Sequence, residues 1–293
     1  MKSARFVSIL SVLGLAAAAS FAATPDGKGG GIASGAHENA QAAGQIIYHG
    51  GPILNNKKGV NVYYIWYGNW TGNTATTILP KFATDESGSP YYNINTTYYG
   101  GAKSKKIKNI VNLKGQASDN YSHGTTLTQS TVLAVVTDAI NNGSLPKDAN
   151  ALYFVLTSQD VNESGFCTQF CGWHSHGNVG GTDLKYSFVG NPARCPSNCL
   201  LLNKTQSPNG NIGADGMVSI IAHELEETVT DPDLNAWYFA TGNENADQCA
   251  WTFGSTYTTG NGATANMNMN GTDYLVQQNW IQAASGRCDV KYP

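Results

Sequence analysis

The stretch 213–238, GADGMVSIIAHELEETVTDPDLNAWY, constrains the fold more than any other part of the chain. Apolar residues recur at helical spacing over 217–229, which predicts a helix with one buried face. The TDP sequence at 230–232 predicts its end, because proline lacks a donor N–H and disfavours helix in the residue before it. The GADG sequence at 213–216 is typical of a turn before the helix.

Polar residues on this predicted helix form the pattern HExxE. His223 and Glu227 are four residues apart and project from one helical face, with Glu224 at its edge. Three of the seven glutamates of the chain fall between 224 and 227, and Ile220 lies one turn before His223. Both facts favour a covered face, although a solvated outer face is the alternative. The pattern is the HExxH motif of zinc peptidases with a carboxylate in place of the second histidine.

Such a motif assigns each residue a chemical role. His223 and Glu227 would bind a metal ion from one side of the helix. Glu224 would act as general base and accept a proton from metal-bound water. A catalytic zinc site has three protein ligands and a water molecule, so a third ligand must come from elsewhere.

Asp231 and Asp233 are one possible source of the third ligand. They follow the helix histidine by eight and ten residues, and ten is the spacing of the metzincin peptidases. The tight turn of that family needs glycine where this chain has Thr230, and the neighbouring proline restricts the segment further.

The segment 243–247, NENAD, is the preferred source. Asn243 would cap a further helix, Glu244 would bind the metal and Asp247 would support it from outside. The alternative is that both acids only favour a helix N-terminus. His174 and His176 are further candidates, expected in a loop closed by a disulfide bond. They would line the site or bind the metal, or else be satisfied by backbone groups.

The beginning of the chain predicts export. Residues 1–22 have a basic start, an apolar run and a small-residue cleavage site, as in a secretory signal peptide. The Gly/Ala/Ser-rich segment 23–44 is expected to be a flexible lead-in, and 45–293 a single domain. Neither the apolar run nor any later stretch is long enough for a confident membrane span. A secreted, extracellular or periplasmic protein is therefore predicted.

Export permits disulfide bonds between the six cysteines. Pairing each cysteine with its neighbour in the sequence is the simplest of the fifteen possible connectivities. It predicts the bonds Cys167–Cys171, Cys195–Cys199 and Cys249–Cys288. A cysteine-ligated zinc site is the alternative, which export disfavours.

The remaining pattern predicts a layered fold that mixes helices and strands around a central sheet, α/β or α+β. Apolar runs and alternation predict strands at 59–66, 105–113, 151–156 and 186–189, and helices at 74–84 and 126–142. The order is compatible with a zincin-like domain that ends in the HExxE helix.

Composition excludes several classes of function. The net charge is −3 and no basic block is present, so nucleic acid is not an expected partner. The chain has no GxSxG motif, no Walker loop and no GxGxxG after a predicted strand. Serine-hydrolase and nucleotide chemistry are therefore not expected.

Four motifs in order resemble the EXORDIUM family, also called phosphate-induced proteins: GVNVYYIWYGNW, FCTQFCGWHSH, FVGNPARCPSNC and SPNGNIGADGMVSIIAHELEETVTDP. The resemblance runs from about residue 50 to the end of the chain. It implies a secreted or cell-wall-associated protein with no settled biochemical activity. The His-Glu pair after DGMV is similar to a microbial branch of the family rather than to its plant members.

Two functional classes follow. The first is a secreted metal-dependent hydrolase, most simply a peptidase, acting on a peptide, protein or cell-wall substrate. The second is a non-catalytic extracellular binding or signalling protein. Zinc is the expected ion, with calcium and manganese as alternatives because carboxylates also suit harder cations.

Overall fold

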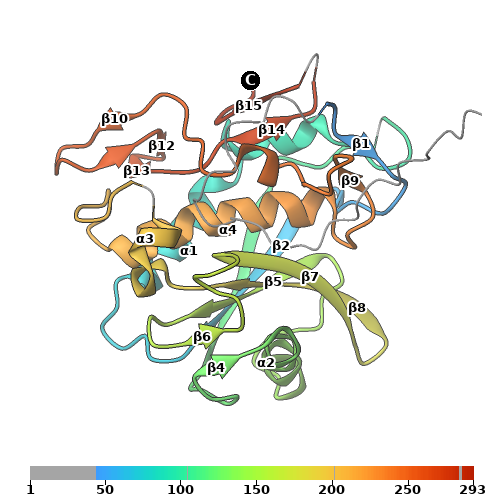
Figure 1. Cartoon of the computed structure of the whole chain (residues 1–293). Coiled ribbons are helices and arrows are strands. Elements are labelled where there is room, and N and C mark those ends of the chain that lie inside the picture. Colours follow the sequence, from blue (N-terminus) through green and yellow to red (C-terminus); the bar gives the residue numbers. More distant parts are fainter. Residues whose placement is uncertain (1–43, 104, 201, 284–285) are drawn as a thin grey trace, which may run out of the picture.

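The computed structural model describes residues 44–103, 105–200, 202–283 and 286–293 (Figure 1). The predicted signal peptide and nearly all of the lead-in lie outside these residues. The helices are α1 Ala75–Glu86, α2 Gln129–Asn141, α3 Pro196–Cys199 and α4 Ile212–Thr230, with short 3-10 helices η2 Tyr92–Thr97, η3 Pro192–Arg194 and η4 Asp247–Cys249. The strands are β1 Ile47–Tyr48, β2 Val60–Tyr67, β3 Val111–Asp119, β4 Thr126–Leu127, β5 Ala151–Thr157, β6 Asn162–Glu163, β7 Gly172–Val179, β8 Thr182–Val189, β9 Trp237–Tyr238, β10 Tyr257–Thr258, β11 Thr264–Ala265, β12 Met267–Met269, β13 Thr272–Tyr274, β14 Asn279–Ile281 and β15 Arg287–Asp289.

A five-stranded sheet in the order β3-β2-β5-β8-β7 forms the centre. Neighbouring strands are parallel except for the edge strand β7, which runs antiparallel to β8. Parallel strands need crossover connections: α1 connects the neighbours β2 and β3, and α2 connects β3 to β5 on the other side of β2. The prediction of a mixed α/β fold with a central sheet is confirmed.

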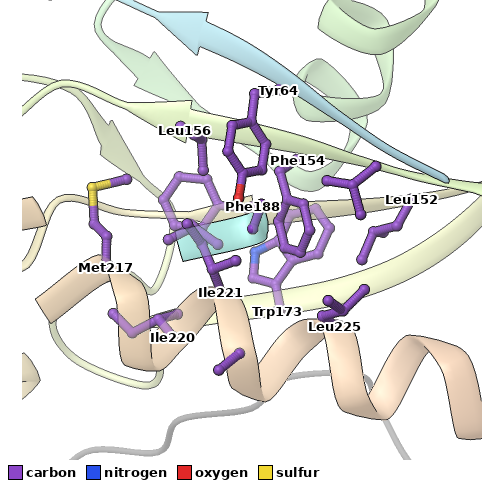
Figure 2. Packing of buried hydrophobic residues seen from close by; sticks show 14 of the residues in the cluster. Tyr64, Leu152, Phe154, Leu156, Trp173, Phe188, Met217, Ile220, Ile221 and Leu225 are labelled. Atoms are coloured by element: carbon purple, nitrogen blue, oxygen red, sulfur yellow. The ribbon is translucent and has the colours of Figure 1, made fainter. Parts of the chain in front are cut away.

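Helix α4 packs across one face of the sheet, and α2 lies on the opposite face (Figure 1). Figure 2 shows Met217, Ile221 and Leu225 of α4 pointing toward the sheet, where Leu152 and Phe154 of β5 lie above Leu225 and Ile221. All five side chains are at most 1% exposed. Full burial of a side chain of this size contributes about 1.5–3 kcal/mol. This packing fixes the position of α4 against the sheet.

The C-terminal hairpins cover the other side of α4 (Figure 1). Every residue of α4 is buried except Ile212 and Gly216. The expected covered face of this helix is therefore confirmed, with His223 1% and Glu227 0% exposed.

The predicted turn at 213–216 is wrong, because α4 already begins at Ile212. The side chain of Asn211 caps the helix by accepting the backbone N–H of Ala214 at 3.0 Å. Glycine is required there by close packing rather than by a turn. A Cβ atom on Gly216 would lie 2.4 Å from Leu200 Cδ2 and 2.5 Å from Pro192 Cγ.

Other boundaries also differ from prediction. The strand expected at 105–113 lies instead at Val111–Asp119, and the first residues of the helix expected at 126–142 form β4. That helix begins after Thr128, which makes a reciprocal capping box with Thr131. The loop expected around His174 and His176 is strand β7.

Two of the three predicted disulfide pairings are wrong. The bonds are Cys167–Cys195, Cys171–Cys199 and Cys249–Cys288, so only the third pairing is confirmed. The two CxxxC segments face each other, with Cα–Cα distances of 5.8 and 5.7 Å across the bonds. They therefore join the segment before β7 to α3 with two adjacent bonds instead of closing two small loops.

No helix among the residues that the structure describes is long and apolar enough to cross a bilayer.

Candidate metal centre

Helix α4 places the three ionisable side chains of the HExxE pattern in the interior. His223, Glu224 and Glu227 are at most 1% exposed. His223 Nε2 lies 3.0 Å from Glu227 Oε1, as the i,i+4 spacing on one helical face allows. The two ligands predicted on this helix, His223 and Glu227, are therefore within contact distance of each other.

Strand β7 contributes a second histidine to the same place. His174 is fully buried, and its Nε2 lies 3.0 Å from Glu244 Oε2 and 3.8 Å from Glu227 Oε2. His174 is in register with Ser187 of β8, which in turn is in register with Phe154 of β5, so the three side chains share the sheet face that α4 covers. The histidine therefore reaches the site from a rigid strand.

The segment before η4 and the first residue of η4 supply the remaining acids. Glu244 is 1% exposed, and Asp247 Oδ1 lies 3.4 Å from His223 Nε2. The backbone N–H of Asp247 donates to Glu227 Oε1 at 2.9 Å. Asn243 does not cap a helix as predicted, because the cap of η4 is Ala246.

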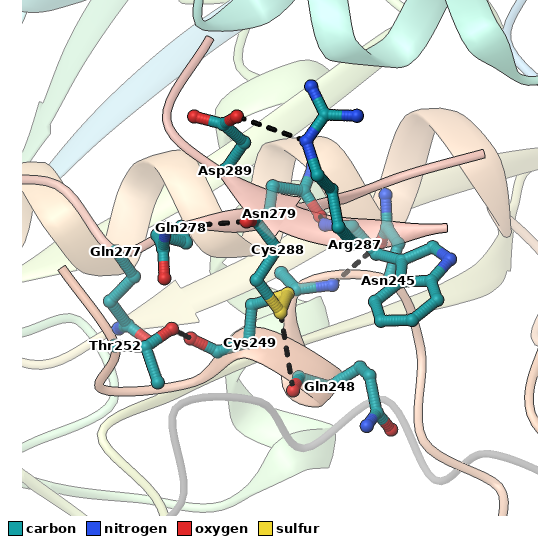
Figure 3. The surroundings of a disulfide bond; sticks show 12 residues. Asn245, Gln248, Cys249, Thr252, Gln277, Gln278, Asn279, Arg287, Cys288 and Asp289 are labelled. Atoms are coloured by element: carbon teal, nitrogen blue, oxygen red, sulfur yellow. Dashed lines mark hydrogen bonds and ion pairs between the residues drawn. A yellow bond between two sulfur atoms is a disulfide. The ribbon is translucent and has the colours of Figure 1, made fainter. Parts of the chain in front are cut away.

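A disulfide bond holds this segment (Figure 3). Cys249, the last residue of η4, is bonded to Cys288 of β15. Cys288 Sγ also contacts the carbonyl oxygen of Gln248 at 3.7 Å. Asp247 is two residues from this tether, so its position depends on the C-terminal hairpin.

The possible ligand atoms form two overlapping groups. His174, Glu227 and Glu244 make one, and His223, Glu227 and Asp247 make the other, with ligand atoms within 4.8 Å of one another in each. These five residues are called the buried centre below. Neither lysine nor arginine pairs with its carboxylates among the described residues, and Glu227 Oε2 has no hydrogen-bond partner there.

Burial dominates the electrostatics of the buried centre. It lowers the pKa of His174 to about 3, so this imidazole is neutral, which is the form that binds metals. Burial, followed by repulsion from Asp247, raises the pKa of Glu227 to about 7. Burial and repulsion from Glu227 also raise the pKa of Glu244 well above its usual value. Burial lowers the pKa of His223, but Glu227 and the other nearby carboxylates together raise it well above its ordinary value.

Glu224 lies beside the buried centre, against β7. A Cβ atom on Gly172 would come within 2.9 Å of Glu224 Oε1 and 2.5 Å of Ile220 Cγ2, so glycine allows the close approach of β7 to α4. Neither carboxylate oxygen of Glu224 has a hydrogen-bond partner among the described residues. Burial raises its pKa well above the usual value.

The aspartates that follow α4 lie outside the buried centre. Asp231 Oδ1 accepts the backbone N–H groups of Asn235 and Ala236, both at 2.6 Å, and so shapes the turn after the helix. Burial raises its pKa to about 6. Asp233 instead pairs with Lys185 of β8 at 2.5 Å.

Asp233 belongs to a second group of ionisable residues at the surface. His176 Nδ1 lies 2.9 Å from Asp183 Oδ1 and 4.0 Å from Asp233 Oδ1, and the ammonium group of Lys185 contacts both aspartates. These four residues are called the surface cluster below. The cluster already contains its own cation.

Sequence reasoning did not identify β7 or the surface partners of His176. One signal for the strand was present. Gly180 and Gly181, both with positive φ, form the two-residue turn between β7 and β8. Two glycines between extended segments are typical of a β-hairpin. Asp183 and Lys185 then follow from pairing across that hairpin, where His176 is in register with Lys185.

The sequence is similar to that of several proteins with related names. The conserved region described as phosphate-induced protein 1 matches residues 46–288. EXORDIUM-like 3 of Arabidopsis thaliana is 34% identical over 278 residues, which cover 82% of this chain and 82% of the relative. EXORDIUM-like 5 of the same plant is 33% identical, covering 82% and 77%, and PHOSPHATE-INDUCED 1 of Nicotiana tabacum is 30% identical, covering 66% and 67%. No solved structure matches the chain significantly.

Proposed function

The chain belongs to the EXORDIUM or phosphate-induced protein family, and we propose that it is a non-catalytic extracellular protein whose fold is stabilised by a divalent metal in the buried centre. The observation that carries this proposal is the burial of two histidines and two carboxylates beside a third, partly exposed carboxylate, without a lysine or arginine partner among the described residues. None of the relatives' names denotes a reaction.

A divalent cation fits the chemistry of the donor set. Buried carboxylates without a cation are costly, and each would otherwise have to take up a proton. Imidazole nitrogens combined with carboxylate oxygens suit zinc, and manganese suits the same set. Calcium fits less well because it prefers oxygen ligands throughout.

The origin of the ligands supports a stabilising role. They come from β7, from α4 and from residues 244–247 at the start of η4, so a metal would cross-link three parts of the chain. Four of the five ligand residues are at most 1% exposed, and only the side chain of Asp247 reaches solvent, at 23%. A large substrate has no open approach to such a centre.

The disulfide bonds support an extracellular location. Three bonds connect all six cysteines. Such bonds persist in oxidising compartments and are rare in the cytosol. The secretory signal predicted at 1–22 agrees with export.

Metal analysis of the purified protein tests this proposal. We expect bound divalent ion in the wild type and a lower metal content in His223→Ala, with His176→Ala as the matched control that keeps the wild-type content. At a free metal concentration of 100 times Kd, the ion should add about 2.7 kcal/mol to the free energy of unfolding. Metal-free wild-type protein with unchanged thermal stability in added zinc or manganese would contradict the proposal.

A zincin-like hydrolase is the second candidate, and Glu224 is the observation that favours it. This carboxylate is fully buried next to His223, and neither oxygen has a hydrogen-bond partner among the described residues. A general base beside metal-bound water needs such a position. The substrate would be a peptide, a protein or a cell-wall polymer.

Glu224→Gln distinguishes the two candidates. If Glu224 is a general base, the change should lower a hydrolytic rate by about 10²–10⁴-fold while metal content stays constant. The non-catalytic proposal instead predicts no metal-dependent cleavage in a screen of peptide and polysaccharide substrates. Cleavage that is lost both with chelator and in Glu224→Gln would establish the hydrolase.

A further inference from the structure

Two overlapping ligand groups that share one carboxylate suggest more than a single metal ion. We propose that the buried centre binds two divalent ions bridged by Glu227, which rests on the proposed function and goes beyond it. The ligand group of His223 lies at Oε1 of Glu227, and the ligand group of His174 lies at Oε2. His223 Nε2 lies 3.0 Å from Oε1, and His174 Nε2 lies 3.8 Å from Oε2.

The first ion site lies between α4 and η4. Its ligands are His223 Nε2, Glu227 Oε1 and Asp247 Oδ1, and the histidine and aspartate atoms are 3.4 Å apart. Metal–ligand bonds of about 2.0–2.2 Å place neighbouring ligand atoms at such a distance. With three protein ligands, this ion keeps an open coordination position.

The second ion site lies between α4 and β7. Its ligands are His174 Nε2, Glu227 Oε2 and Glu244. Both oxygens of Glu244 are near the histidine nitrogen, at 3.2 and 3.0 Å, so this carboxylate can bind an ion with two oxygens. The second site is therefore closed by four ligand atoms from three residues.

The two ligand groups are too far apart to bind a single ion together. Ligands of one ion with bonds of about 2.0–2.2 Å lie at most about 4.4 Å apart, on opposite sides of the ion. Among the described residues, no group of ligand atoms within 4.8 Å of one another contains both His174 and His223. Glu227 belongs to both groups, as a bridging carboxylate does in two-metal sites, where the ions are about 3.5–4 Å apart.

Charge balance also favours two ions. Glu224, Glu227, Glu244 and Asp247 carry four negative charges when ionised, and all except Asp247 are at most 1% exposed. One divalent ion would leave two of these charges uncompensated in the interior, where isolated charge is costly. Two divalent ions balance all four carboxylates.

The two sites differ in their exposure to solvent. The first site contains Asp247, whose side chain is 23% exposed, whereas every ligand of the second site is at most 1% exposed. The first ion should therefore exchange with solvent faster than the second. A chelator should remove the two ions in two separate phases.

Manganese titration of the full-length, metal-depleted wild type tests the proposal. We expect two bound Mn²⁺ ions per chain and an electron paramagnetic resonance spectrum with the magnetic coupling of a close pair. One uncoupled ion would overturn the two-ion proposal and leave the proposed function intact. Absence of bound ion would overturn both.

Single substitutions then assign the sites. Asp247→Asn should remove the first ion and Glu244→Gln the second, each leaving one ion per chain without magnetic coupling. Asp233→Asn, in the surface cluster, is the control and should keep two coupled ions. If a variant does not fold, the two phases of wild-type chelation decide instead, and a single phase would count against two distinct sites.

Discussion

Strand β7 carries two histidines that have similar partners but opposite surroundings. His174 belongs to the buried centre and is fully buried, whereas the side chain of His176, two residues later in the surface cluster, is 38% exposed. Each histidine has carboxylates within reach. The surface cluster also contains Lys185, while no lysine or arginine pairs with the buried carboxylates among the described residues.

The contrast shows how burial decides the need for an external cation. At the surface, water and Lys185 compensate the aspartates, and hydrogen bonds from Lys185 and His176 outweigh partial burial and keep the pKa of Asp183 below its usual value. In the buried centre, burial instead raises the pKa of Glu227 and Glu244. The same residue types therefore form a salt-bridged surface group in one place and a candidate metal centre in the other.

The largest effect is expected for the shared carboxylate. Glu227→Gln removes a ligand from both ion sites, so zinc affinity should fall by more than the roughly 10–100-fold lost when a supporting residue is removed. Asp233→Asn is the matched change in the surface cluster and should leave affinity unchanged. Calorimetric titration of both variants measures the difference. A greater loss in Asp233→Asn would reverse the assignment of the two regions.

The next effect concerns the pH dependence of stability. Burial raises the pKa of Glu224, Glu227 and Glu244, with Glu227 at about 7, and the neighbouring carboxylates raise that of His223. Their stabilising contributions are complete below the unfolded-state pKa values and are lost as pH rises through the folded-state values. His174, with a pKa lowered to about 3, contributes in the opposite direction between about pH 6.5 and 3.

The three glutamates and His223 thus act in one direction, and only His174 acts in the other. We therefore predict that the metal-free protein loses stability as the pH rises from about 4.5 to 7. The metal-loaded protein should gain stability over the same range, because protons compete with metal for the ligands. Urea unfolding with chelator and with zinc measures both slopes. If the free energy of unfolding depends on pH equally with chelator and with zinc, the metal does not bind these carboxylates.

The smallest effect is expected for Lys185→Met. This change removes the cation of the surface cluster and leaves His176, Asp183 and Asp233 with ligand atoms within 4.8 Å of one another. We expect only a new, weak zinc site, because two of its ligands, His176 and Asp183, are 38% and 43% exposed. Titration of Lys185→Met in the Glu227→Gln background, which lacks the carboxylate shared by both buried sites, isolates that site. If this surface site binds zinc as tightly as the wild-type buried centre does, burial does not determine zinc affinity.

Much of the fold follows from local sequence patterns. The continuous apolar run of β5 and the helical spacing of α4 predicted these elements, because both are buried and have strong periodicity. Strand β7 has no such pattern, since its residues GWHSHGNV contain only two apolar side chains, Trp173 and Val179. Its strand structure depends on pairing with β8, a tertiary interaction that hydrophobic periodicity does not reveal.

The candidate site was predictable in part for the same reason. His223, Glu224 and Glu227 follow from one helix, but the approach of His174 to Glu244 joins residues 70 positions apart. The disulfide pairings show this limit as well, because equal CxxxC spacings suit pairing within a segment and between segments. Only the packing of α3 against the segment before β7 selects Cys167–Cys195 and Cys171–Cys199.

Anomalous X-ray scattering at the zinc edge, from crystals of zinc-loaded protein, tests the central claim most directly. The account predicts two peaks about 3.5–4 Å apart on either side of Glu227, one beside His223 and one beside His174, and none in the surface cluster. A single peak beside His176, Asp183 and Asp233, with the buried centre empty, would contradict it.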